Sequence, residues 1–413
     1  MAMKAWQLMR PADARTAPLR LSEVDEPEPG PGEIRLRVRA CGVCLTDVHI
    51  AEGDLVPPEY PVTPGHQVVG VVDAVGPGVE GIRPGERRGA YWLHQACGRC
   101  EACRRGEENL CPHARFTGLH VPGGYAEAMV VPAAYTVPVP PAFDDATAAP
   151  LLCAGVIGYR ALRLSGLRAG ERLALFGFGS SAHLVLQVAR HQGCQVVVFT
   201  RSPAHRELAR RLGAAWAGGA EVLRRDEPAV PGTPAAAGDG PSEPGLGGAA
   251  ANGRTHPTPA RAEEQGRDGK AMDDPRFPRA VGEEPPDAEI PLPCDRAIVF
   301  APAGELVPLA LRAVRPGGTV VINAVHMSDI PSFPYRLLHG ERVLRSVAHV
   351  TRRDAEEFMA LAAALPLQVA VQRYPFDQAN RALADVKESR VNGAAVLVVG
   401  EAPRRRPHPG RQP

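Results

Sequence analysis

Four cysteines crowd into one short stretch of the chain, and the first three of them are evenly spaced. They are Cys97, Cys100, Cys103 and Cys111. Thiolates at such spacings converge on a single metal ion, and zinc takes four of them in a tetrahedron. Four protein ligands leave no position open for a substrate, so the motif predicts a closed, structural zinc site. The alternative is an iron–sulfur cluster, but the spacing differs from the common ferredoxin runs.

A second, dispersed set of ligand-type residues consists of Cys44, His66 and Cys153. Two cysteines and one histidine are a recognised zinc ligand set that leaves a fourth position open for water or substrate, as catalysis requires. Spacing alone does not establish such a site. A buried free cysteine is a common core residue, and a lone histidine is usually structural.

A glycine-rich turn, GFGSSA, begins at Gly177 and lies between the apolar run RLALF and the helical pattern AHLVLQVAR. A turn between a strand and a helix is typical of dinucleotide-binding sites. Its glycines let the backbone approach the pyrophosphate, and the helix N-terminus carries partial positive charge. The predicted cofactor contacts in this turn are Gly177, Phe178, Gly179, Ser180 and Ser181.

The next predicted strand, VVVF, ends in Thr200 and Arg201 with no carboxylate. NAD-specific sites usually place Asp or Glu at this point for the ribose hydroxyls, whereas a nearby arginine accommodates the 2′-phosphate of NADP. Thr200 and Arg201 therefore favour NADP(H) over NAD(H). The alternative is that Arg201 points to solvent and the site accepts both cofactors.

The elements that must position these residues change character along the 413-residue chain. From about residue 34 to 140, short β-rich runs alternate with Gly/Pro turns, which predicts a compact β body. From about residue 171, strands alternate with helices, the pattern of βαβ units around a parallel sheet. The last stretch returns to β-rich sequence and is expected to rejoin the first body. The expected divisions are 1–152, with a zinc lobe at about 94–113, then 153–348 and 349–413.

Residues 221–289 interrupt the βαβ series with a stretch rich in Pro, Gly, Ala and charge. Its isolated apolar residues follow neither a helical nor a strand period. Such a segment cannot bury enough apolar surface to offset its chain entropy, so we expect disorder. Because loops above about 12–15 residues are uncommon inside a compact domain, the segment is either a tolerated insertion, which we favour, or a functional lid.

The overall composition excludes several classes of function. The formal net charge of +1 gives no basic field for nucleic acid. No apolar run approaches the roughly 20 residues that span a membrane, and the N-terminus lacks a signal-peptide pattern. The nine cysteines are an odd number and are clustered, which suits metal ligation in a reducing compartment better than disulfides. We therefore expect a cytoplasmic protein.

Five segments together resemble the zinc-containing medium-chain alcohol dehydrogenase family, in the family's order and along nearly the whole chain. They are CGVCLTDVH from Cys41, PGHQVVG from Pro64, the four-cysteine lobe ending in ENLC, PLLCAG from Pro150 and the glycine-rich turn. The resemblance implies a mixed α/β and β fold. A GroES-like, β-rich catalytic domain would accompany a Rossmann cofactor domain with a doubly wound parallel sheet, and the active site would lie between them.

The resemblance also assigns roles to individual residues. Cys44, His66 and Cys153 fall on the catalytic zinc ligands, and the four-cysteine lobe falls on the structural zinc. Thr46 matches the hydroxyl that touches the zinc-bound alkoxide, and His49 matches the outer member of a proton relay. Asp47 matches the carboxylate that orients a metal-bound imidazole. Leu55 and Trp92 occupy positions that line the substrate pocket, although Trp92 could equally be an ordinary core residue.

One departure from the family pattern lies beside the catalytic zinc. The family commonly has Glu after its histidine ligand, whereas this chain has Gln67. A neutral amide there should leave the zinc slightly more electrophilic. With Gln67 at this position, there is also no carboxylate that could exchange with a ligand of the zinc.

The resemblance thus implies a zinc-dependent alcohol dehydrogenase or aldehyde reductase that uses NAD(P), a small-molecule substrate and a homodimeric or homotetrameric assembly. A polyol or formaldehyde-type dehydrogenase of the same family is the runner-up. A zinc-free quinone reductase is a distant alternative, because it would have no reason to retain both ligand sets. A non-enzymatic descendant would need a broken ligand set or relay, and both are complete in this sequence.

Overall fold

The computed structural model describes residues 1–224 and 290–400, which belong to one compact unit of the chain. Most of the segment expected to be disordered, 221–289, lies outside the described residues. Its first four residues correct that expectation, since Ala220–Arg224 form a 3-10 helix whose Leu223 is buried beside α7 (Leu306–Ala313). Composition alone missed this turn because a single buried leucine carries no periodic signal.

A seven-stranded, mostly antiparallel sheet forms the first body, in the order β16-β17-β3-β4-β5-β9 with β8 also paired to β3. Its strands are β3 (Glu33–Val43), β4 (Gln67–Val75), β5 (Arg87–Ala90), β8 (Ala128–Pro132), β9 (Thr136–Pro138), β16 (Val371–Pro375) and β17 (Ala394–Val398). β17 runs antiparallel to β3, with Leu397 opposite Cys41. The C-terminal β-rich stretch therefore joins the sheet built by the first part of the chain, as the sequence indicated.

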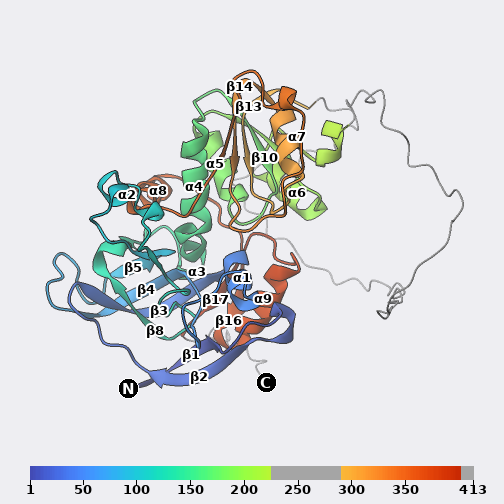
Figure 1. Ribbon diagram of the computed structural model, residues 1–413. Helices are drawn as coiled ribbons and strands as arrows, with labels where there is room; N and C mark the ends of the chain where they lie inside the picture. Colours follow the sequence, from blue (N-terminus) through green and yellow to red (C-terminus); the bar gives the residue numbers. More distant parts are fainter. Residues whose placement is uncertain (225–289, 401–413) are drawn as a thin grey trace, which may run out of the picture. The chain divides into compact units, whose positions relative to one another are not determined.

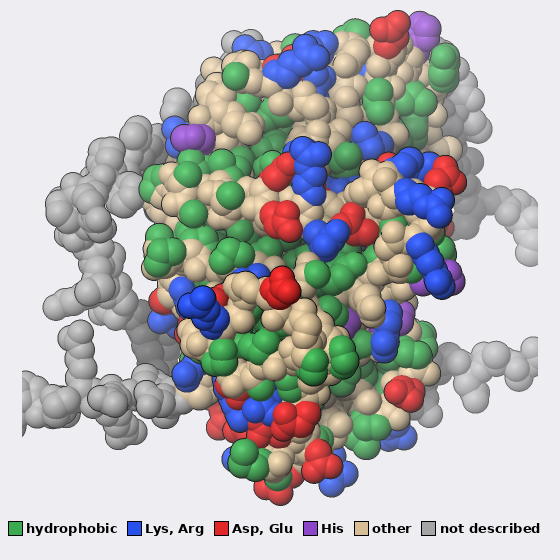
Figure 2. Space-filling model, turned by 90° about the vertical axis from the view of Figure 1, so that its left-hand side faces the viewer, with side chains coloured by type: hydrophobic (Ala, Val, Ile, Leu, Met, Phe, Trp, Pro, Cys, Tyr) green, Lys and Arg blue, Asp and Glu red, His purple; other side chains and the backbone are tan. Residues whose placement is uncertain are grey.

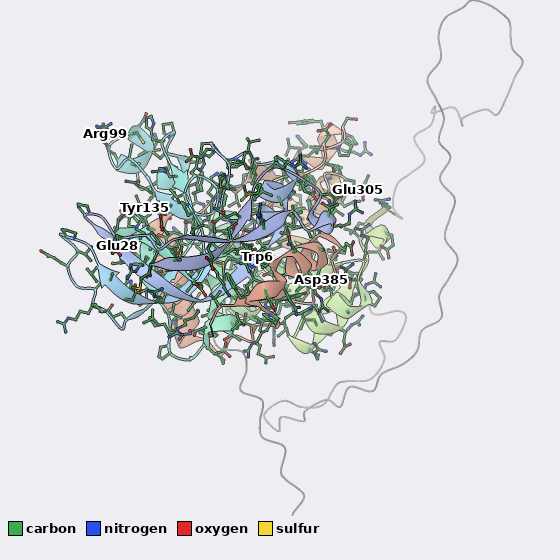
Figure 3. The ribbon with its side chains drawn as sticks, turned by 90° about the horizontal axis from the view of Figure 1, so that it is seen from below. Trp6, Glu28, Arg99, Tyr135, Glu305 and Asp385 are labelled. Carbon is green, nitrogen blue, oxygen red and sulfur yellow. The ribbon has the colours of Figure 1, made fainter. Side chains whose placement is uncertain are left out.

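The first strand and the C-terminal part of the described chain also meet at this body. The indole N–H of Trp6 in β1 (Ala2–Leu8) donates to the carbonyl of Phe376 at 2.7 Å. Tyr374 in β16 donates its hydroxyl to Asp385 in α9 (Ala379–Lys387) at 2.8 Å, and Figure 3 labels Trp6 and Asp385 on these elements. These contacts fix the C-terminal segment against β1 and the first sheet.

The second body is a six-stranded sheet, and all its pairings are parallel. Its order is β12-β11-β10-β13-β14-β15, and β12 (Trp216–Gly218) is one edge. The other strands are β10 (Arg172–Phe176), β11 (Gln195–Phe199), β13 (Cys294–Val299), β14 (Val314–Ile322) and β15 (Val343–Ser346). Strand order reverses between β10 and β13, and in open parallel sheets ligands bind beyond the carboxyl ends of the strands at such a point.

Helices cover both faces of the parallel sheet, which explains why β10 and β11 are almost continuously apolar. Leu173 and Leu175 share a core with α4 (Ala154–Ser165) and α5 (Ala182–His191). Ala174 and Phe176 point to the other face and share a core with α7. Figure 1 shows α4 and α5 on one side of this sheet and α7 on the other. The predicted combination of a β-rich body and a doubly wound parallel sheet is confirmed.

The described surface agrees with the balanced charge of the sequence. On the face drawn in Figure 2, basic and acidic side chains are interspersed and form no single-sign field. Within residues 1–224 and 290–400, no helix combines the length and the apolar character needed to cross a membrane.

Candidate metal centres and cofactor site

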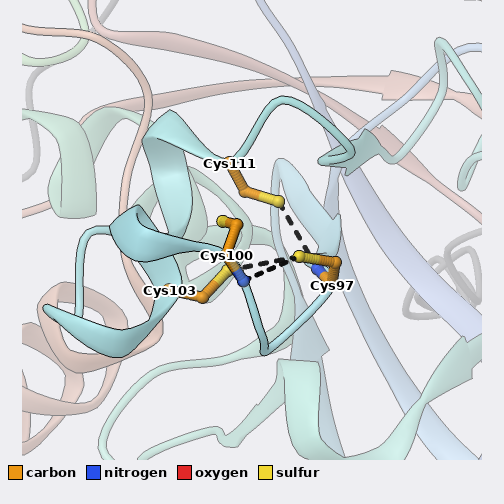
Figure 4. A group of neighbouring side chains, drawn as sticks. All are labelled: Cys97, Cys100, Cys103 and Cys111. Carbon is orange, nitrogen blue, oxygen red and sulfur yellow. Dashed lines mark hydrogen bonds between the residues drawn. The ribbon is translucent and has the colours of Figure 1, made fainter.

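The four cysteines of the lobe converge, as their spacing predicted. They lie around α2 (Glu101–Arg104) and η2 (Glu108–Leu110), and their Sγ atoms all lie within 4.8 Å of one another (Figure 4). The Sγ atoms of Cys97 and Cys103 are 4.0 Å apart, close to the roughly 3.8 Å that separates two sulfur ligands in a tetrahedral zinc site. Gly98 has a φ of +70°, which lets the chain reverse directly after Cys97. The geometry fits a closed zinc site.

Backbone N–H groups point at the sulfurs of the lobe. Cys100 donates to Cys97 Sγ at 3.4 Å, and His113 donates to Cys111 Sγ at 3.4 Å. The N–H groups of Arg99 and Cys100 lower the pKa of Cys97 to about 6, so they favour the thiolate that binds metal. The lobe is anchored by Tyr135, whose hydroxyl accepts the N–H of Ala96 at 2.9 Å; Figure 3 labels Tyr135 and the lobe residue Arg99.

The dispersed set also converges, although its members come from three separate segments. Cys44 directly precedes α1 (Leu45–Glu52), His66 directly precedes β4, and Cys153 directly precedes α4. Their ligand atoms lie within 4.8 Å of one another, and Cys44 Sγ is 3.5 Å from His66 Nε2. His66 is fully buried, whereas Cys44 and Cys153 retain some solvent exposure. Three converging donors of this kind fit a zinc site that leaves a fourth position for water or substrate.

Asp47 lies behind this group, where the resemblance predicted a carboxylate. It is buried, it accepts the N–H groups of Cys44 at 2.9 Å and Gly65 at 3.2 Å, and its Oδ1 is 3.5 Å from His66 Nδ1. Burial lowers the pKa of His66, but the negative charges of Asp47 and Cys44 outweigh burial and raise it to about 10. The surroundings therefore favour a positive charge at His66, which a metal ion on Nε2 would supply while Nδ1 faces the carboxylate.

The two predicted relay residues share helix α1. Thr46 is buried in the first turn, and His49 follows one turn later on the same face. His49 Nδ1 lies 2.8 Å from Asp54 Oδ2, and the Asp54 side chain is 42% exposed. This contact lowers the pKa of Asp54, and it links His49 to a carboxylate that is partly exposed to solvent. Sequence reasoning missed Asp54, although a carboxylate in the turn that follows a helix histidine is a usable signal.

Of the two predicted pocket residues, Trp92 lies directly beside His66, one of the predicted metal ligands. Its ring meets His66 edge-on at a centroid distance of 4.9 Å and stacks on Phe116 at 4.9 Å. Leu55 is half-buried just beyond α1, where its N–H donates to the carbonyl of His49 at 3.1 Å. Phe116 and His349, which both contact Trp92, were missed because they are distant in sequence and belong to no motif.

Gln67, the departure from the family pattern, is buried at the start of β4. It packs over Gly42 in β3, where an added Cβ would lie 2.7 Å from the Gln67 side chain. Gly42 thus makes room for the amide in the interior next to His66.

The glycine-rich turn lies at the carboxyl end of β10, where the strand order reverses. Gly177 has a φ of +91°, and an added Cβ would lie 2.9 Å from the backbone nitrogen of Ala301, which follows β13. An added Cβ at Gly179 would meet no atom within 4 Å, so the space beside it is open. Phe178 is buried, and its side chain belongs to the core shared with α4 and α5. The turn can hold a pyrophosphate mainly through backbone N–H groups, with Ser180 and Ser181 beside the start of α5.

Thr200 and Arg201 stand at the carboxyl end of β11, as predicted. Thr200 is buried; its N–H donates to Gly218 at 2.7 Å, and its carbonyl accepts Arg206 Nε at 2.9 Å. Arg201 is exposed. A fixed arginine from α6 (Pro203–Arg211) and an exposed arginine thus flank the position where NAD-specific sites carry an acid.

Comparisons with known proteins agree with this geometry. Residues 30–141 match the alcohol dehydrogenase GroES-like domain. A probable alcohol dehydrogenase of Mycobacterium tuberculosis is 40% identical over 403 residues, which cover 96% of this chain and 97% of that protein. An NADP-dependent alcohol dehydrogenase C of Mycobacterium bovis is 36% identical over 49% of this chain and 61% of that protein. The solved cinnamyl alcohol dehydrogenase of Sorghum bicolor shares the fold, with a TM-score of 0.74, 22% identity and coverage of 97% and 98%.

Proposed function

The chain belongs to the zinc-type medium-chain alcohol dehydrogenase family, and on that premise we propose that it transfers a hydride between a primary or secondary alcohol and NADP(H). Reduction of the corresponding aldehyde or ketone is the reverse reaction. The observation that carries the proposal is the convergence of Cys44, His66 and Cys153, with Asp47 behind His66. The same ligand set serves a polyol or formaldehyde-type dehydrogenase, which the substrate screen below distinguishes.

The three converging donors would hold the catalytic metal. A zinc ion there supplies Lewis acidity, which lowers the pKa of a bound alcohol as it brings bound water to about 7. Asp47 accepts two backbone N–H groups and faces His66 Nδ1, so it orients the imidazole and holds the Cys44 segment in place. Trp92 walls the site beside His66 and excludes water from it. The four-cysteine lobe would hold the structural zinc.

A proton has to leave this enclosed site when an alcohol is oxidised. Thr46 is buried next to Cys44, and His49 follows on the same helix face with its Nδ1 against Asp54. We assign Thr46 as the hydroxyl that takes the proton from the alcohol and His49 as the imidazole that passes it outward. Asp54 completes the path, because its partly exposed carboxylate reaches solvent.

The cofactor is assigned to the glycine-rich turn and the end of β11. Gly177 and Gly179 admit the pyrophosphate, and the N-terminus of α5 adds partial positive charge. Arg201 is free to form a charge-assisted hydrogen bond to the 2′-phosphate of NADP, and Thr200 leaves no negative charge to repel it. The NADP-dependent relative from Mycobacterium bovis supports this choice.

A turnover screen tests the proposal. Purified protein is assayed with simple alcohols, polyols, aromatic aldehydes and formaldehyde, with both nicotinamide cofactors, in the wild type and in Thr46→Val. We expect turnover of simple alcohols or aldehydes, and a loss of about 10²–10⁴-fold in Thr46→Val, the typical contribution of a proton-transfer group. Zinc-replete wild type that turns over none of these substrates would overturn the proposal, as would full activity in Thr46→Val.

A further inference from the structure

The indole of Trp92 is held from a distant part of the chain. Trp92 Nε1 donates to His349 Nδ1 at 2.9 Å across a separation of 257 residues. His349 lies between β15 and α8 (Arg352–Ala364), beyond the last strand of the parallel sheet. We propose that His349 is a positioning residue, which fixes the Trp92 wall beside the metal ligands and thereby sets substrate selectivity. The role of His349 in selectivity rests on the proposed function, whereas the hydrogen bond between Trp92 and His349 does not.

The chemistry of the contact fixes the state of both rings. An indole nitrogen can only donate, so Nδ1 of His349 must accept, and the imidazole must be neutral with its proton on Nε2. Burial, together with the charges of Arg160 and His120, lowers the pKa of His349 and maintains that neutral state. The hydrogen bond is therefore available throughout the neutral pH range.

Two other rings also contact Trp92. His66 meets it edge-on at 4.9 Å, and Phe116 stacks on it with an interplanar angle of 12°. The His349 ring also contacts Phe116, at a centroid distance of 4.4 Å. Trp92 is thus held by its hydrogen bond to His349 and by ring contacts with His66, Phe116 and His349, and the hydrogen bond is the directional contact among these.

The backbone of His349 shows that the ring is held in place by its surroundings. Its φ is +55°, a left-handed conformation that is uncommon outside glycine, although Asn, Asp and His adopt it more often than other residues. The preceding carbonyl, of Ala348, accepts the side-chain N–H of the buried Asn109 at 2.7 Å. On the other side, Thr351 and Asp354 form a capping box that starts α8. Such a conformation persists only where neighbouring structure enforces it, and it often marks a functional position.

Two substitutions at His349 separate the effect of losing the hydrogen-bond acceptor from the effect of relaxing the backbone. In His349→Asn the amide oxygen stands close to where Nδ1 stood, and Asn tolerates a positive φ. In His349→Gly the backbone is relaxed but the acceptor is lost. A buried indole N–H without a partner is unfavourable, so the ring should shift in the Gly variant only. Trp92→Phe, alone and with His349→Gly, completes a double-mutant cycle.

The first measurement is the Nε1–H resonances of the three tryptophans in ¹⁵N-labelled protein, with the Trp92 signal assigned by its loss in Trp92→Phe. The second is the ratio of kcat/KM for benzyl alcohol to that for ethanol. We expect His349→Gly to move the Trp92 resonance and to change the ratio by about fivefold, the typical effect of one hydrogen bond. His349→Asn should keep both near wild type, and His349→Gly should have no further effect on the ratio in Trp92→Phe.

Each contrary result has a separate meaning. An unmoved Trp92 resonance in His349→Gly overturns the pairing itself. A moved resonance with an unchanged substrate ratio overturns the selectivity role, as does a Gly effect that persists in Trp92→Phe. If the wild type turns over neither alcohol, the ratio is taken between two substrates of different size that the screen above finds active. A wild type that turns over no substrate of that screen refutes the proposed function together with the selectivity role, and the resonances then decide the Trp92–His349 pairing alone.

Discussion

Asp47 Oδ1 lies 3.5 Å from Nδ1 of His66, and the exposed fractions of the two side chains are only 0% and 1%. The same carboxylate accepts the backbone N–H groups of Cys44 and Gly65. One buried acid therefore ties together the segment before α1 and the segment before β4, each of which carries a proposed zinc ligand.

Replacing this acid should loosen the catalytic metal. In Asp47→Asn we expect zinc affinity at that site to fall about 10- to 100-fold, the usual effect of removing the partner of a metal-bound histidine. The rate and extent of zinc release to a chelator measure this affinity. Asp73→Asn, which alters a carboxylate of β4 that pairs with Arg35 and Arg37, is the matched control. An Asp47→Asn protein that holds zinc as tightly as the wild type would contradict the assignment.

The end of β11 should decide between the two cofactors. We expect the wild type to favour NADPH over NADH at least tenfold in kcat/KM, because Arg201 can pair with the 2′-phosphate and Thr200 carries no charge. Thr200→Asp combined with Arg201→Ala should remove most of that preference. Arg211→Ala, on an exposed arginine of α6, should leave it unchanged. A wild type that prefers NADH would refute the assignment of Arg201 to the 2′-phosphate of NADP.

His183 should make the fold sensitive to mild acid. It is fully buried in α5, with Nδ1 3.3 Å from the carbonyl of Gly179, and burial lowers its pKa to about 4. Below the ordinary value of 6.5 the unfolded chain binds a proton at this residue that the folded chain does not. The free energy of unfolding therefore falls as pH decreases from 6.5 toward 4, by about 2 kcal/mol between about pH 7 and pH 5.

Urea unfolding of the wild type and of His183→Asn at several pH values isolates this contribution. The Asn variant should lose less stability on acidification, because it has no group to protonate. His191→Asn, at the exposed end of the same helix, is the control and should follow the wild type. Parallel pH profiles for the wild type and His183→Asn would show that His183 is protonated equally in both states.

The sequence was most informative where the chemistry is local. The lobe from Cys97 to Cys111 is one short segment, and its spacing alone predicts convergence. Cys44, His66 and Cys153 are far apart, and only their resemblance to a known family selects them. The parallel sheet was predictable because its buried strands are continuous apolar runs, such as RLALF, separated by helical periods.

Contacts made by tertiary folding left no such signal. His349 reaches Trp92 across 257 residues, and nothing near His349 in the sequence indicates a partner. Phe116 belongs to a two-residue strand, too short for any period to be read. Leu223 packs in the core that includes α7, and Val222 packs beside it, but charged residues flank this pair, so composition assigned residues 221–224 to the interrupting segment.

Zinc content is the direct test of whether Cys44, His66 and Cys153 hold one zinc ion and the four-cysteine lobe holds another. Elemental analysis of gently purified wild type should find about two zinc ions per chain, and Cys44→Ala should retain about one, lose turnover and keep its fold by circular dichroism. Cys41→Ala, which changes a buried neighbouring cysteine outside both ligand groups, should retain the wild-type content. Wild type without zinc, or Cys44→Ala with the full wild-type content, would contradict the account.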